Sequence, residues 1–570
     1  MTDEKFLIED GVLVKYIGGS EEQVVVPDGV TAVGDRAFAR CDTVAEIILP
    51  DSVVAIGERA FMECGWLTKI VLPDSLEFID ASAFRRCDSL EAVYLPDSLK
   101  MLPVACFYEC ANLKSVRLPA GIKQISPRTF YGCSGIEAIV LPEGLTEIEE
   151  CAFEYCTSLC SVKLPDSLTA IGRHAFARCY ELSDINIPAG VKSIGCNAFH
   201  QTAFIENTDN GFVIGGDGIL ISCAVGAEHI TVPAGIKMIG EMAFAYNDRV
   251  QSVKLPDGVI EICSSAFERC TALSEISLPD SLRIIGDRVF EECSSLEKIS
   301  LPDGVTQIGS KAFEYTPIEE GSEMLILNDK YLIAYHGEEE YPQIPDTVEV
   351  IAGGAFSGNT DIKSVSLGGK VRFVCREAFR WCRELEEVHI SAAVQYLGAY
   401  AFSGCGKLHA HIECARRTVG ESTFETGQWI TFTEGDRSFD LQLQNVLAAG
   451  SCEHALFAFA AERTEQRFIQ MAIPEYCLPA AICYAESGDV FADYLRENIV
   501  SAVCMVIDRG DIELLRRVLG YGFLTERQTA ECAAYAIEQK AFEQQVMIMR
   551  YKQDTFGAIS DEALDSKFDW

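Results

Sequence analysis

The sequence predicts a mainly β solenoid of stacked 23-residue coils with a parallel sheet on one face, followed by a smaller all-α domain. Three observations support this. A small residue followed by Phe recurs every 23 residues within three blocks, with the Phe at positions 38 to 199, 244 to 313 and 356 to 402. Apolar residues keep fixed places inside each repeat, which is typical of units that bury their apolar face by stacking. After about residue 438 the period disappears, and Ala, Leu, Glu and Gln dominate.

One coil shows how the repeat is expected to fold. In residues 67–72, alternation with a period of two directs Ile70 inward and Lys69 and Val71 outward, as in a half-buried strand. Pro73 then turns the chain, because proline fixes φ and cannot donate to a β-ladder. The following apolar residues and the Phe are expected to fill the interior of the coil.

Three blocks are expected within a solenoid of residues 1–435, namely 1–205, 206–320 and 321–435. Each block opens with a hairpin-like insert, and these inserts explain why the Phe spacing increases to 45 residues (199 to 244) and to 43 residues (313 to 356). Asp10-Gly11, between alternating apolar residues, is a hairpin turn signal in the first insert.

The predicted core contains two ladders, one aromatic and one of thiols. Eleven of the 24 cysteines lie three residues after the recurring Phe. Free Cys behaves as a small, readily buried hydrophobe, so the regular spacing favours a structural role over a disulfide framework. The ladder residues are Phe61, Phe84, Phe107, Phe130, Phe153 and Phe176, with Cys64, Cys87, Cys110, Cys133, Cys156 and Cys179.

The repeat resembles a known bacterial class. Residues 49–70 read L-P-D-S-V-V-A-I-G-E-R-A-F-M-E-C-G-W-L-T-K-I. This pattern, repeated over residues 6–424, is similar to the BspA-like (Treponema-type) leucine-rich repeats. The resemblance implies a right-handed leucine-rich-repeat solenoid with a parallel sheet on one face, and a non-enzymatic binding role, often as a secreted adhesin.

The region of residues 436–555 is predicted to be α-helical, with a tail over 556–570. Segments such as 441–449 and 455–463 have helical spacing of apolar residues, and turns at 487–489, 509–511 and 520–522 divide them. Residues 506–523 resemble the helix pair of an ankyrin repeat. The alternative is a helical cap that covers the open end of the solenoid.

Charge and terminal sequence restrict the partners and the location. With 47 Lys and Arg against 86 Asp and Glu, the formal net charge is −39, so nucleic acid is not expected as a partner. The N-terminal residues carry acids where a secretion signal has a basic region, and no apolar run is long enough for a membrane span. We therefore expect a cytoplasmic protein; removal of a leader would instead place it at the cell surface.

A single dense cluster of metal-ligand types stands out: Cys405, His409, His411 and Cys414. His409 and His411 are expected on the same side of a strand, as a chelate requires, but zinc also needs thiolates that converge with them. Cys405 belongs to the predicted thiol ladder and is expected to point away from the histidines. We therefore expect no metal and no cofactor, and keep a metal protein or enzyme based on this cluster as a second alternative.

The outward strand positions vary while the rest of the coil is fixed, and they form the candidate partner-binding face. An aromatic residue and an Arg within a mixed apolar surface are residue types that anchor interfaces. The leading hypothesis is a non-catalytic scaffold that recognises a protein or peptide there; an adhesin for host protein or glycan is the first alternative. The candidate residues are Ile48, Lys69, Val71, Tyr94, Arg117, Val140 and Lys163.

Overall fold

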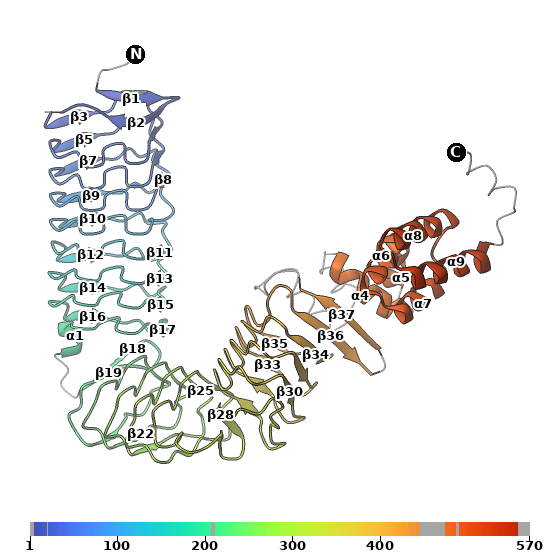
Figure 1. The fold of residues 1–570 in the computed structure, drawn as a ribbon. Helices are drawn as coiled ribbons and strands as arrows, with labels where there is room; N and C mark the ends of the chain where they lie inside the picture. Colours follow the sequence, from blue (N-terminus) through green and yellow to red (C-terminus); the bar gives the residue numbers. More distant parts are fainter. Residues whose placement is uncertain are drawn as a thin grey trace. The chain divides into compact units, whose positions relative to one another are not determined.

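Parallel pairing between successive coils builds the repeat region of the computed structural model (Figure 1). The structure describes residues 5–19, 21–206, 211–435, 437–443, 474–485 and 489–556. The chain groups into two compact units, Met1–Gly321 and Ser322–Trp570. The first unit contains the first two blocks, and the second contains the third block together with the helical region.

In the first block, each coil contributes a strand to one or both of two faces. The face formed by three-residue strands, which we call the strand face, contains a five-stranded and then a three-stranded parallel sheet: β3 (Gln23–Val25), β5 (Glu46–Ile48), β7 (Lys69–Val71), β9 (Ala92–Tyr94) and β10 (Ser115–Arg117), then β12 (Ala138–Val140), β14 (Ser161–Lys163) and β16 (Asp184–Asn186). The second face has two-residue strands: β4 (Ala32–Val33), β6 (Ala55–Ile56), β8 (Phe78–Ile79), β11 (Gln124–Ile125), β13 (Glu147–Ile148), β15 (Ala170–Ile171) and β17 (Ser193–Ile194).

The second face is interrupted between β8 and β11 at Pro103. In regular coils the residue after the short strand donates its N–H to the preceding coil, as Gly57 does to Val33 O and Asp80 to Ile56 O. Proline has no N–H, so the coil at residue 103 cannot make this bond, and the sheet ends there.

Each of the three inserts is an antiparallel hairpin that precedes its block. They are β1 (Phe6–Glu9) with β2 (Val12–Tyr16), β18 (Phe212–Gly215) with β19 (Ile219–Cys223), and β27 (Met324–Leu327) with β28 (Tyr331–Tyr335). The second strand of each hairpin pairs in parallel with the first regular coil, so the hairpin starts the ladder. A short helix, α1 (Ala203–Glu206), ends the first block.

The second and third blocks repeat the two-faced coil. The second block contains β20 (His229–Thr231), β22 (Ser252–Lys254) and β24 (Glu275–Ser277), with β21 (Met238–Ile239), β23 (Glu261–Ile262), β25 (Ile284–Ile285) and β26 (Gln307–Ile308). The third block contains β30 (Ser364–Leu367), β32 (Glu387–Ile390), β34 (His409–Glu413), β36 (Trp429–Glu434) and β37 (Arg437–Gln442), with β29 (Val350–Ile351), β31 (Phe373–Val374), β33 (Tyr396–Leu397) and β35 (Thr418–Val419).

The core of the repeats is a stack of Phe rings. Phe84 and Phe107 are fully buried, with ring centroids 5.3 Å apart and planes 7° from parallel. The other ring pairs within the first block repeat this spacing. Burying one such ring contributes roughly 1.5–3 kcal/mol, so the column is a large part of the favourable free energy of the array.

The predicted N-terminal boundary of the helical region is wrong. The boundary at residues 435 and 436 falls inside an antiparallel hairpin, because β36 pairs with β37 from Trp429↔Gln442 to Glu434↔Arg437. Phe439 and Leu441 alternate with exposed or half-buried neighbours and are buried against the repeat core, which is a strand pattern. Residues 444–449, the expected helix at 455–463, Ser487 and Gly488 lie outside the described residues.

The described C-terminal residues form helices that pack on one another, and the first of these helices also packs on the last strand. They are α4 (Pro474–Tyr484), α5 (Asp489–Glu497), α6 (Ile499–Arg509), α7 (Ile512–Gly520), α8 (Glu526–Glu538) and α9 (Phe542–Phe556). One hydrophobic core runs from Leu332 to Ile548, and the Tyr484 ring contacts Phe439 of β37 with centroids 6.2 Å apart. Helix α4 therefore packs against the last strand of the third block. The cap interpretation and the ankyrin-like assignment both stay predictions.

Candidate partner-binding face

Outward side chains of the five-stranded sheet form one continuous column, which we call the strand-face column. Strand pairing places Val25 beside Ile48, and Ile48 beside Val71. At the other end Tyr94 pairs with Arg117, and the pairing of Lys69 with Ala92 brings Val71 next to Tyr94. Val25 is 59% exposed and Tyr94 58%, so the column presents apolar surface to solvent.

Arg117 is held in place by three neighbouring groups. Its guanidinium carbon lies 4.5 Å from the centroid of the Tyr94 ring, a cation–π contact. Its Nη1 donates to Leu95 O at 2.9 Å, and its Nη2 donates to Asp97 Oδ2 at 2.6 Å, which lowers the pKa of the Asp97 carboxyl. These contacts fix the orientation of the Arg117 side chain.

A polar row runs beside the column, two residues earlier on each strand. Gln23 Nε2 donates to Glu46 Oε2 at 2.7 Å, and Lys69 Nζ lies 2.6 Å from Glu46 Oε1. The hydrogen bond from Lys69 is the main reason that the pKa of Glu46 is lowered. The apolar column is therefore bordered by polar groups, the arrangement of a small protein interface.

The structure separates the predicted face residues into two sheets. Val140 is 84% exposed and pairs with Lys163, but both lie in the three-stranded sheet that follows β10. Lys163 Nζ is 3.8 Å from Glu143, a weak, exposed ion pair. The sequence analysis missed Val25, although Val26-Pro27-Asp28 marks its coil in the same way that Leu49-Pro50-Asp51 marks the next.

The predicted ladder residues lie in the interior, each at most 1% exposed. The thiol of each ladder Cys donates to the carbonyl oxygen of the Phe 26 residues earlier, at 3.0 to 3.2 Å. Burial raises the pKa of the Cys87, Cys133 and Cys156 thiols well above the ordinary value. Because the thiolate is the nucleophilic form, burial keeps these thiols in their less reactive, protonated form.

The cluster of Cys405, His409, His411 and Cys414 does not form a four-ligand site. Cys405 is fully buried in the thiol ladder and donates to Phe379 O at 3.1 Å, whereas His409 and His411 lie on the outward face of β34. The two sides of a strand face opposite directions, so a ligand from the interior cannot join them. The histidines instead lie beside residues of β32.

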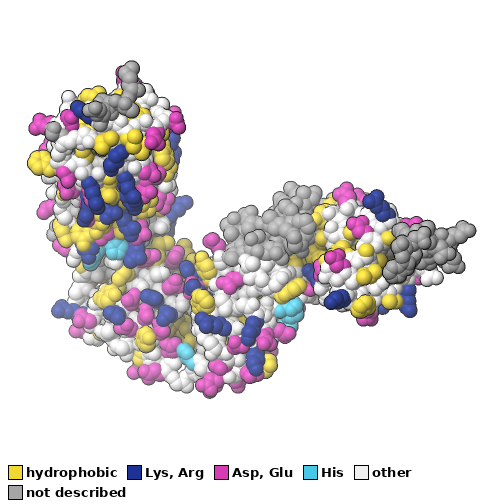
Figure 2. Space-filling model, turned by 45° about the horizontal axis from the view of Figure 1, so that its top comes forward, with side chains coloured by type: hydrophobic (Ala, Val, Ile, Leu, Met, Phe, Trp, Pro, Cys, Tyr) yellow, Lys and Arg dark blue, Asp and Glu magenta, His cyan; other side chains and the backbone are white. Residues whose placement is uncertain are grey.

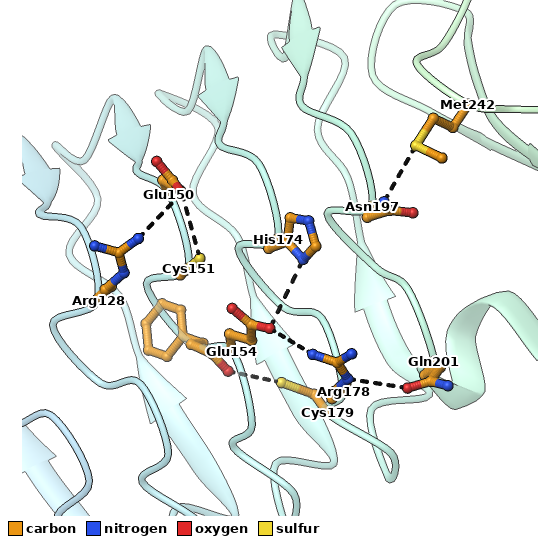
Figure 3. A network of polar contacts seen from close by, with 11 residues as sticks. Arg128, Glu150, Cys151, Glu154, His174, Arg178, Cys179, Asn197, Gln201 and Met242 are labelled. Carbon is orange, nitrogen blue, oxygen red and sulfur yellow. Dashed lines mark hydrogen bonds and ion pairs between the residues drawn. The ribbon is translucent and has the colours of Figure 1, made fainter. Parts of the chain in front are cut away.

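A network of polar contacts links successive coils near the end of the first block (Figure 3). The buried Glu154 carboxylate accepts from Arg178 at 3.0 Å and lies 3.9 Å from His174 Nδ1. Cys151 is near this group, but burial and the neighbouring Glu154 raise the pKa of its thiol to about 12. A thiol with that pKa is almost entirely protonated at neutral pH.

A cavity of about 510 Å³ lies at the junction of the first two blocks. Tyr16 and Tyr335 place their rings on the first Phe of their blocks, with centroids 5.1 Å from Phe38 and Phe356. Cys223 takes the equivalent hairpin position in the second block, where it pairs with Phe212 as Tyr16 pairs with Phe6. The smaller side chain leaves space between Phe199 and the second block, and Phe199 and Cys223 line the cavity.

Acidic and basic side chains are mixed with apolar ones over the described surface seen in Figure 2, without a large region of one sign. None of the helices in the described parts of the chain is both long and apolar enough to cross a lipid bilayer.

Comparison with known proteins identifies the repeat. No curated protein matches the chain. A leucine-rich repeat protein of T. pallidum is 30% identical over 32% of this chain and 90% of its own, with a TM-score of 0.30. A leucine-rich cell surface protein of Faecalibacterium prausnitzii is 24% identical over 72% and 93%, with a TM-score of 0.31, and a leucine-rich repeat protein of Bacteroides ovatus is 20% identical over 72% and 97%, also with a TM-score of 0.31.

The family model described as the BspA type leucine rich repeat region matches four segments that together cover most of the solenoid, residues 16–137, 123–210, 222–323 and 330–438. These segments contain the Phe column, the thiol ladder and the strand face described above. The protein is therefore a member of the BspA type leucine-rich-repeat family.

Proposed function

We propose that this protein is a non-catalytic scaffold that binds a protein or peptide across the strand-face column. The observation that supports this most is the pair formed by Tyr94, which is 58% exposed, and Arg117, which is fixed over the Tyr94 ring. Trp, Tyr and Arg dominate the energetics of protein interfaces, and here two of these types stand together beside exposed aliphatic residues.

The chemistry of the column favours a polypeptide over other partners. Val25, Ile48 and Val71 offer apolar contact, and the neighbouring Glu46 and Lys69 offer hydrogen bonds of both kinds. A net charge of −39 opposes the approach of nucleic acid, because phosphates bind by replacing counterions with Lys and Arg. An extended or helical peptide with its own apolar stripe matches this surface.

A double substitution, Tyr94→Ala with Arg117→Ala, tests the proposal. The matched control is Tyr246→Ala with Arg269→Ala, which removes a cation–π pair of the same composition from the second block. Proteins captured from native cells by the wild-type chain are identified and quantified, and affinity is then measured with the purified partner. We expect the Tyr94 and Arg117 variant to bind about tenfold or more weakly and the control to bind normally. Equal binding by both variants would show that the strand-face column is not the interface.

The alternative, an adhesin that binds host protein or glycan, uses the same face but requires a different location. Membership of the BspA type family favours it, because the resemblance implies secreted members. Fractionation of native cells with an antibody against the solenoid separates the two: a cytoplasmic pool supports the intracellular scaffold, and a protease-accessible surface pool supports the adhesin.

A further inference from the structure

Four side chains of metal-ligand type lie together on the outward face of the third block. Strands β32 and β34 are parallel neighbours, with Glu387 paired with His409 and His389 paired with His411. Residues two apart on a strand point to the same side, so the four side chains form a two-by-two array. Both strands belong to a five-stranded sheet, which holds the backbone positions of the array.

Three of these side chains converge. One ligand atom from each of Glu387, His389 and His411 lies within 4.8 Å of the other two. The His389 and His411 rings have centroids 4.7 Å apart, and His389 Nε2 lies 3.9 Å from Glu387 Oε2. Glu387 and His389 are exposed, so their side chains can rotate toward a shared ion without a change in the backbone.

The fourth residue, His409, contacts His411 and the neighbouring strand. Its ring stacks on that of His411 with centroids 4.4 Å apart, and its Nε2 lies 2.6 Å from the Thr431 hydroxyl oxygen of the next strand. A hydrogen bond of this kind fixes the orientation of a ring, and His411 is thereby held between His409 and His389. The site is thus partly organised in the absence of an ion.

We propose that Glu387, His389 and His411 bind a divalent transition-metal ion of the zinc type. Two imidazole nitrogens and one carboxylate oxygen are a ligand set that zinc accepts in proteins, at about 2.0–2.2 Å from each atom, with a fourth position open. Calcium and magnesium prefer oxygen ligands, so two imidazole ligands disfavour the binding of either ion. The open position would accept water or a donor group from a bound molecule.

The site combines two exposed side chains, Glu387 and His389, with the half-buried His411. This site differs from the cluster at residues 405–414 because Cys405 takes no part, and it lies outside the first block that contains the strand-face column.

Zinc titration of the full chain by calorimetry, in the presence of excess magnesium, tests the site. Magnesium competes for the many surface carboxylates, so the zinc binding that remains reports a site with nitrogen or sulfur ligands. Cobalt replaces zinc in a second titration, because its visible absorption reports tetrahedral coordination. We expect one equivalent of zinc to bind at micromolar concentration or tighter, and the cobalt complex to show tetrahedral bands.

Substitutions distinguish this site from others on the chain. His389→Gln and His411→Gln should each weaken zinc binding by at least about tenfold, since even outer-shell changes cost that much. Cys405→Ser should bind as wild type, and so should His229→Gln, which removes an outward His of β20 that contacts Ser252. Absence of saturable binding, unchanged binding in both His variants, or loss of binding in Cys405→Ser would overturn the proposal. Thermal melts of each variant confirm that the fold is retained.

Discussion

The thiol of Cys110 donates a 3.0 Å hydrogen bond to the carbonyl oxygen of Phe84, 26 residues earlier. That carbonyl also accepts from the N–H of Cys87, so the thiol uses its second lone pair. At this position the small Cys side chain also acts as a hydrogen-bond donor. Thr202 and Thr316, which replace Cys in two other coils, donate instead to the Phe carbonyl three residues earlier in their own coil.

Removal of this donor should destabilise the first block. Cys110→Ala leaves a small cavity and loses one buried hydrogen bond, and we expect the free energy of unfolding to fall by about 1–2 kcal/mol. Urea denaturation measures the change. Cys160→Ala is the control, because Cys160 is exposed and should change stability by less than about 0.5 kcal/mol. Equal effects of the two substitutions would contradict a structural role for the thiol ladder.

Stacking in the Phe column predicts that the effects of substitutions on stability are coupled for adjacent rings and independent for distant rings. Phe84→Leu and Phe107→Leu should be non-additive by about 0.5–1.5 kcal/mol in a double-mutant cycle, because the two rings stack directly. Phe84→Leu with Phe153→Leu is the matched pair, three coils apart, and should be additive to within about 0.5 kcal/mol. Denaturation of the wild type, the two single variants and the double variant in each cycle gives both values. Strong coupling in the distant pair would mean that the coils do not stack as nearest neighbours.

The cavity beside Cys223 predicts opposite effects for two reciprocal substitutions. Cys223→Tyr supplies the ring that the other two hairpins carry and should raise the free energy of unfolding by about 1–2 kcal/mol through added apolar burial. Tyr335→Cys removes a ring that packs on Phe356 and should lower the free energy of unfolding by about 2–4 kcal/mol. Thermal or urea denaturation measures both. If Cys223→Tyr is destabilising, the space at the block junction does not accept a ring in the column.

The lowered pKa of His411 predicts that the free energy of unfolding falls as the pH is lowered. Because burial and the neighbouring histidines lower the pKa of its folded form, the unfolded state binds more protons near the ordinary value of about 6.5. The free energy of unfolding therefore decreases as pH falls through about 6.5, and the decrease ends below the pKa of the folded state. In metal-free buffer, His411→Gln should show a smaller loss between about pH 7.5 and about pH 5.5 than wild type. An identical loss in both proteins would exclude His411 as a source of this pH dependence.

The sequence predicted the repeat and its inner surface well because the evidence is periodic. A single Phe or Cys carries little information, but the same residue at a fixed interval identifies an interior column. The apolar alternation around Ile70 likewise predicted which strand residues face inward. The boundary at residue 435 was wrong because β37 contains only six residues, and its alternating Phe439 and Leu441 precede a segment with helical composition.

The surface sites depended on tertiary structure. From the sequence, His409 and His411 had Cys405 and Cys414 as their nearest candidate ligands, whereas the fold brings Glu387 and His389 beside them across a pair of parallel strands. Parallel pairing of strands in the first block likewise adds Val25 to the strand-face column and places Arg117 over Tyr94.

Spacing along the chain thus determined which residues enter the core, because the same positions of the repeat are buried in every coil. Which outer residues become neighbours was decided only by the register between coils. That register brings together side chains more than 20 residues apart. Because the outward positions vary from coil to coil, no repeated residue in the sequence marks these contacts.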